Sequence, residues 1–314
     1  MSAKKNIKQK RTLKVKRLLI VAAVLFALGL ALCIIGALVS RARSVALFDQ
    51  TKNADGSYTY SYDFKSDSIK KISLDVSFAD VNIIGGAEEN KLELINYSHS
   101  GFQLTTSATT LSVKEKQGVD AFGIFSGFSF KGLRNLIYGV NFIGKDRTVN
   151  IYITDDSVLK LFDCKIHSGN VNINDVAGSV KLEFDMNYGS LKAKGIGGDA
   201  SLDINIKEGN ADVEKSSLGK LSAVLDKGYL YLNGVKTVDV DADIKKGYFK
   251  YVTGDFDLES AVLTLKSEEG KVRYLDDIYE SGSFSQGMQY VGTSVTQIII
   301  DVAVANGNIM ITKQ

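Results

Sequence analysis

Residues 202–213 read LDINIKEGNADV, and this stretch carries the pattern that decides the fold. Apolar side chains alternate with polar ones on both sides of Gly209, at offsets −7, −5 and −3 before the glycine and +2 and +4 after it. Alternation with a period of two is typical of a β-strand that buries one face. Two such runs separated by a glycine predict two short strands that meet at a corner.

The same offsets recur around a series of glycines spaced 19 to 23 residues apart, namely Gly169, Gly189, Gly209, Gly228, Gly247 and Gly270. Two outlying segments fit as well, with Ala79 in the place of the glycine near the start and Gly307 near the end. A unit of this length with two strands is typical of one coil of a β-solenoid. We therefore predict an all-β fold, a parallel β-solenoid of about 20 residues per coil, in which equal offsets stack on one another.

Composition supports a folded β-protein. Of the 314 residues 45% are hydrophobic and 24% are charged, with 29 Gly and no Pro, which disfavours a disordered chain and a helical bundle. Ten of the 38 Lys and Arg lie in residues 1–43, so the rest of the chain carries 28 basic against 36 acidic residues. This acidic remainder argues against nucleic acid as a partner.

Residues 18–39 form a run of 22 uncharged, almost wholly apolar positions. As a helix the run would span about 33 Å, close to the hydrocarbon thickness of a bilayer, so we predict a transmembrane helix. Eight Lys and Arg precede the run and two follow it, which predicts a cytoplasmic N-terminus and an extracytoplasmic C-terminal domain at the cell membrane. A cleaved signal peptide and lipidation at Cys33 are the alternatives, although the run is long for the first and Leu32 is unusual for the second.

The predicted organisation is then a basic tail at 1–17, the membrane helix at 18–39, a polar linker at 40–67 and the solenoid domain at 68–314. The register breaks between Leu92 and Asp156, where an insert near 118–147 is rich in glycine and aromatic residues. We expect its apolar part, residues 121–143, either to cap the solenoid end or to contact the membrane or a partner.

The sequence offers no strong catalytic signature. Two Cys and two His cannot supply a Cys/His zinc cluster, and the common hydrolase and nucleotide-binding motifs are absent. We therefore predict no catalytic residue, no metal, no cofactor and no enzymatic activity.

One outward face becomes aromatic and basic along the repeat. At offsets +1 and +3 the later coils carry Tyr229, Tyr231, Tyr248, Lys250, Lys271 and Arg273. Such side chains could bind a glycan by ring stacking or an anionic cell-wall polymer by charge. The alternative is that the tyrosines only add cross-strand packing.

A second outward face, at offsets −6 and −4, is acidic, with Glu183, Asp185, Asp203, Asn205, Asp241 and Asp243. Stacked carboxylates about 4.8 Å apart repel one another, so a calcium ion could bind there, although nearby lysines would also relieve the repulsion. Paired carboxylates also serve in glycosidases, which leaves a polysaccharide-active enzyme as a further alternative.

A family resemblance rests on the opening run ISLDVSFADVNI and on units such as HSGNVNINDVAGSV, NYGSLKAKGIGG and KEGNADVEKSSLG, after a single basic-flanked anchor. Over roughly residues 68–314 the chain resembles the putative adhesin family of bacterial cell-envelope proteins, a domain of unknown function. The resemblance implies a membrane-anchored adhesin or surface-binding module that meets a cell-wall polymer, a glycan or another envelope protein. An accessory or sensor role in an envelope-stress system is the alternative, and with a tail of about 17 residues it would need a membrane partner.

Overall fold

The computed structural model describes residues 48–53, 58–97, 102–115, 147–155, 157–254, 262–286 and 299–313, together with six helical positions between 22 and 29. The chain divides into two units, residues 1–47 and 48–314, and the described strands lie in the second. Within the described residues no helix is long and apolar enough to cross a membrane. The predicted helix at 18–39 lies largely outside the described residues, as does the insert near 118–147.

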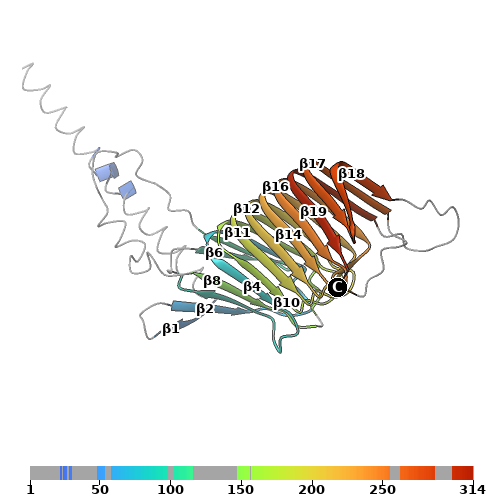
Figure 1. Ribbon diagram of the computed structural model, residues 1–314. Coiled ribbons are helices and arrows are strands. Elements are labelled where there is room, and N and C mark those ends of the chain that lie inside the picture. Colours follow the sequence, from blue (N-terminus) through green and yellow to red (C-terminus); the bar gives the residue numbers. More distant parts are fainter. Residues whose placement is uncertain are drawn as a thin grey trace, which may run out of the picture. The chain divides into compact units, whose positions relative to one another are not determined.

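The second unit is all-β (Figure 1). Its first half contains β1 (Asp49–Lys52), β2 (Tyr58–Asp63), β3 (Lys71–Phe78), β4 (Asp80–Ile84), β5 (Lys91–Ile95), β6 (Phe102–Thr106), β7 (Thr110–Glu115), β8 (Thr148–Tyr152), β9 (Leu161–Ser168) and β10 (Val171–Asn174). The second half contains β11 (Lys181–Lys194), β12 (Ser201–Glu214), β13 (Ser217–Leu218), β14 (Lys220–Asn233), β15 (Lys236–Thr237), β16 (Asp239–Val252), β17 (Val262–Tyr274), β18 (Asp277–Gln286) and β19 (Ile299–Thr312).

The long strands stack in parallel with equal offsets opposite each other, as the repeat predicts. Leu202 of β12 lies between Leu182 of β11 and Leu221 of β14, and the corner glycines of the three strands are also paired. We call the residues that one coil contributes on both sides of its corner a rung. The apolar offsets are buried throughout these rungs, so the core is a stack of apolar layers, consistent with a β-solenoid.

The corner glycines form a continuous spine because each rung passes very close to the next. A Cβ atom at Gly209 would overlap the carbonyl oxygen of Gly189, and one at Gly228 would overlap that of Gly209. Gly209 also has a φ of 157°, a backbone angle that L-residues with a side chain rarely adopt. The spine is therefore a packing requirement of the stacked rungs.

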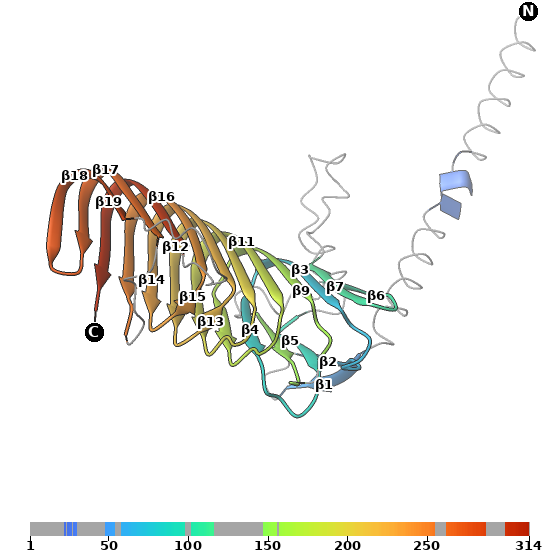
Figure 2. The same cartoon turned by 90° about the vertical axis from the view of Figure 1, so that its right-hand side faces the viewer.

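The order of the last rungs differs from the order in the sequence. The sequence pattern suggests that the Gly270 rung stacks on the Gly247 rung, but β19 lies between β16 and β17 and is parallel to both (Figures 1 and 2). The core positions of the two strands explain this order. All five core offsets of β19 are apolar and buried, whereas β17 carries Ser267 at offset −3, where its hydroxyl donates to the Gly307 carbonyl over 2.8 Å. β19 therefore suits the interior position, and the β17–β18 antiparallel pair suits the end.

At the other end the rungs continue before the first corner glycine. β3 and β4, joined at Ala79, pair in parallel with β9 and β10, as predicted from the opening strand pair. β7 and β8 form a further rung on the far side of β3 and β4, and the insert connects them. Antiparallel strands then close this end, with β6 on β7 and with β5, β2 and β1 in succession beyond β8.

An aromatic cluster fills the closed end. Phe102 packs edge-on against Phe48, Tyr60 and Tyr97, with ring centroids 5.1 to 5.9 Å apart. Part of this cluster comes from residues 48–63, which we expected in a polar linker and which instead supply β1 and β2. The alternating aromatic run from Tyr58 to Tyr62 was the signal for a strand, and the polar residues around it obscured that signal.

Candidate functional site

The tyrosines predicted on the outward face lie side by side on β14 and β16. The rings of Tyr229 and Tyr248 are stacked, with centroids 4.9 Å apart and an interplanar angle of 9°. Lys250 Nζ lies 5.2 Å from the centroid of the Tyr231 ring, a cation–π contact. We call these four residues the tyrosine face. Tyr248 is its most exposed ring, at 43%.

Asp212 of β12 borders the tyrosine face. Partial burial raises the pKa of the Tyr229 hydroxyl, and the negative charge of Asp212 raises it further. Partial burial likewise raises the pKa of Asp212, while Lys192 and a hydrogen bond with Tyr229 act in the opposite direction. Both effects on Tyr229 favour the protonated form of its hydroxyl beside Asp212.

Lys271 and Arg273 do not adjoin the tyrosine face in the way that the sequence order suggested, because β19 intervenes. Asn308 lies opposite Tyr248, and Met310 lies between Lys250 and Arg273. The Lys271 backbone N–H donates to Asn308 Oδ1 over 2.9 Å, so Lys271 lies one strand further along the sheet. This outward surface therefore carries the tyrosine face on β14 and β16, an amide at Asn308 on β19, and the basic side chains of Lys271 and Arg273 on β17.

Polar residues at offset +1 have a structural role that sequence reasoning missed. Where the residue is Asp or Asn, its side-chain oxygen accepts a hydrogen bond from a backbone N–H of the adjacent rung. Asp80 accepts from Asn170 at 2.7 Å, Asn170 from Ser190 at 3.2 Å and Asn210 from Tyr229 at 3.2 Å. These side chains satisfy backbone N–H groups beside the corner, where the backbone hydrogen bonds between neighbouring strands are interrupted. The recurrence of Asn and Asp directly after the corner residue was the available signal.

The amides at offset +3 in the first rungs form a ladder. Asn172 donates to Asn82 and Asn82 to Asn150, each over 2.9 Å, and Asn150 donates to Glu93 over 3.4 Å. Glu93 also accepts from the Tyr152 hydroxyl at 3.2 Å. Because these polar atoms bond to one another, we assign the ladder to stability and not to ligand binding.

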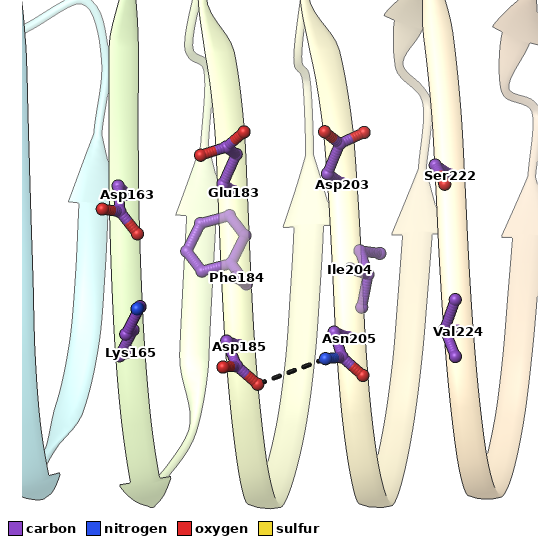
Figure 3. A pocket seen from close by; sticks show the side chains of 10 residues that line it. All are labelled: Asp163, Lys165, Glu183, Phe184, Asp185, Asp203, Ile204, Asn205, Ser222 and Val224. Atoms are coloured by element: carbon purple, nitrogen blue, oxygen red, sulfur yellow. Dashed lines mark hydrogen bonds between the residues drawn. The ribbon is translucent and has the colours of Figure 1, made fainter.

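The acidic face includes a shallow hollow of about 430 Å³ over β9, β11, β12 and β14 (Figure 3). Its lining consists of Asp163, Lys165, Glu183, Phe184, Asp185, Asp203, Ile204, Asn205, Ser222 and Val224. Lys181 Nζ lies 2.5 Å from Glu183 and 3.0 Å from Asp203, and Asn205 donates to Asp185 over 3.3 Å. Hydrogen bonds to these two acids raise the pKa of Lys181, so a lysine charge balances the carboxylates.

Asp241 and Asp243 of the acidic face lie on β16 and are exposed. In the described part of the chain no group of three or more His, Cys, Asp and Glu side chains is arranged to hold a metal ion. At Glu183 and Asp203, Lys181 supplies the nearby lysine charge that was the alternative to a calcium ion. Cys164 is fully buried, and this burial raises the pKa of its thiol, so it is poorly suited to act as a nucleophile.

A protein-family model, Toastrack DUF4097, matches residues 69–312, which cover the whole stack of rungs. The chain belongs to the Toastrack DUF4097 family. This match confirms the resemblance found in the sequence, and the matched range shows that the Toastrack domain extends through β19. No curated protein matches the chain.

Solved structures with a similar arrangement cover 82% of this Toastrack chain. They include a putative cell adhesion protein from Clostridium sporogenes ATCC 15579, with 14% identity, a TM-score of 0.35 and 99% of that chain covered. A putative adhesin from Bacteroides fragilis NCTC 9343 has 12% identity, a TM-score of 0.35 and 97% of its chain covered. A putative lipid binding protein from Parabacteroides distasonis ATCC 8503 has 10% identity, a TM-score of 0.26 and 96% of its chain covered.

Proposed function

We propose that this Toastrack protein is a non-enzymatic surface-binding module of the bacterial cell envelope, anchored in the membrane by residues 18–39. Its tyrosine face then binds an anionic glycan or cell-wall polymer. The observation that carries the proposal is the exposed Tyr248 ring, which has Tyr229 stacked on one side and Asn308 opposite on the other. An amide side chain is smaller than an aromatic ring, so we expect a sugar to stack against the second side of Tyr248.

Charge and hydrogen-bonding groups around Tyr248 suit the same ligand. Lys271 is exposed beyond Asn308, and Lys250 lies two residues from Tyr248 on the same face of β16. Ammonium groups pair with carboxylate or phosphate substituents, and amides hydrogen-bond to hydroxyls. An aromatic platform flanked by these groups is an arrangement that binds anionic sugars.

Alanine at Tyr248 is expected to weaken binding of the full chain to insoluble bacterial cell walls about tenfold, since the aromatic platform contributes about 1.4 kcal/mol. As a separate variant, Lys271→Ala should weaken binding at low salt and have less effect at high salt. Co-sedimentation measures both. The matched control is Tyr188→Ala, which removes a tyrosine of similar exposure from a different face. Equal binding by Tyr248→Ala and the unaltered chain would refute the proposed face.

The anchor makes a separate prediction about topology. A membrane-impermeant thiol reagent should label Lys52→Cys, an exposed position in β1, and should spare Ser2→Cys in intact cells. Labelling after permeabilisation serves as the control for Ser2→Cys. Labelling of Ser2→Cys alone in intact cells would show that the domain faces the cytoplasm.

A further inference from the structure

Three aromatic rings gather on the outside of the corner in adjacent strands, and we call them the corner patch. Phe78 of β3 packs edge-on against His167 of β9 at 5.5 Å, and His167 packs edge-on against Tyr188 of β11 at 5.7 Å. Asn187 Nδ2 lies 2.8 Å from His167 Nδ1, which holds the imidazole in place. Phe78 and Tyr188 are nevertheless 59% and 47% exposed.

The equivalent positions in later rungs are polar and paired. Lys227 bonds to Glu208 at 2.6 Å, and Lys245 bonds to Asp226 at 2.5 Å. Further along, Asn306 donates to Glu269 over 2.8 Å. Offsets −2 and −1 are thus suited to water over the later rungs, and within the described strands they are aromatic at the end where the insert joins the solenoid.

Both ends of the insert are held beside the corner patch. Glu115 is the last residue of β7, which pairs with β3, and Arg147 directly precedes β8, which pairs with β4. These two residues, on either side of the insert, form an ion pair. Glu115 Oε2 also accepts a hydrogen bond over 2.7 Å from the backbone N–H of Ser77, the residue before Phe78. Since neighbouring strands are about 4.8 Å apart, the insert starts and finishes within one or two strand spacings of the Phe78 ring.

The intervening residues have the composition of a segment that buries apolar surface. Between 121 and 143 they include Phe122, Phe125, Phe128, Phe130, Tyr138 and Phe142. We propose that this aromatic part of the insert docks on the corner patch and covers Phe78 and Tyr188. The contact would remove apolar surface from water on both partners, at little entropic cost because the segment is tethered at both ends beside the patch.

The absence of Trp from the chain allows a single-tryptophan test. Phe128→Trp in the full chain should emit at short wavelength, as a buried indole does. Adding Phe78→Ser and Tyr188→Ser together should shift the emission towards that of the denatured chain, while adding Tyr248→Ser, an exposed aromatic on another face, should leave it unchanged. The two corner substitutions should not lower the thermal midpoint of the strands by circular dichroism, since neither side chain belongs to the apolar core inside the rungs.

An emission wavelength that stays unchanged when Phe78→Ser and Tyr188→Ser are added would overturn the proposal. If it then shifts only with phosphatidylglycerol vesicles, the insert binds lipid, and if it shifts only with protein concentration, the insert binds a second copy. A tryptic digest gives an independent readout, because Lys131 and Arg134 lie within the segment. Cleavage there should accelerate several-fold in the Phe78→Ser/Tyr188→Ser variant, and an unchanged rate would likewise contradict docking.

Discussion

Alanine at Gly209 is expected to destabilise the domain by about 3 kcal/mol or more, which is large against a typical margin of 5 to 15 kcal/mol. Two effects add. The φ of 157° is unfavourable for a residue with a Cβ atom, and the new methyl group would overlap the Gly189 carbonyl oxygen. Relief requires two rungs to separate, which disrupts the apolar layers on both sides of the corner.

The control for this substitution is Gly197, in the turn between β11 and β12. No atom lies within 4 Å of a Cβ built there, and its φ is outside the left-handed region. Gly197→Ala should therefore change stability by less than about 0.5 kcal/mol. Denaturant melts of residues 48–314 compare the two variants. Equal effects would mean that the corner glycines are not closely stacked.

Much of the fold could be predicted because its cause is local. The alternation around each glycine places the same side chains inside in every rung, and Leu202, Ile204 and Ile206 are buried as their offsets predict. The stacked pair Tyr229 and Tyr248 follows from the same reasoning, since equal offsets lie opposite each other in a parallel sheet.

The order of the final rungs could not be predicted in this way. Because the offsets are equal in all rungs, any rung can stack on any other, and the pattern does not predict whether β17 or β19 lies next to β16. The choice depends on long-range packing, in which the apolar core offsets of β19 lie between two neighbours and Ser267 of β17 lies nearer the end. For the same reason Lys271 and Arg273 were assigned one strand too close to Tyr248 and Lys250.

Closure of the opposite end depends on similarly distant contacts. Phe48 and Tyr60 precede the repeat in the sequence, and they meet Phe102 because β5 pairs with β8 and β6 pairs with β7. No periodic pattern connects these segments. The polar groups near Tyr248, to which we assign glycan binding only as a proposal, depend equally on contacts across the sheet, because Asn308 lies opposite Tyr248 only through the insertion of β19.

The order of the strands is the central structural claim, because it decides which side chains surround Tyr248. Disulfide formation tests it with two matched cysteine pairs in a Cys33→Ser background. In the structure Asp243 of β16 is paired with Ala303 of β19, and Ala303 is paired with Lys266 of β17, all at the same outward offset. A disulfide needs Cα atoms within about 7 Å, whereas strands two positions apart are separated by about 9.6 Å.

Mild oxidation should therefore crosslink Asp243→Cys/Ala303→Cys nearly completely and leave Asp243→Cys/Lys266→Cys reduced. Mass spectrometry of tryptic peptides distinguishes the linked from the reduced form, and Cys164 does not interfere because it is buried. Crosslinking of Asp243→Cys/Lys266→Cys, with Asp243→Cys/Ala303→Cys left reduced, would show that the rungs stack in sequence order and would contradict the insertion of β19.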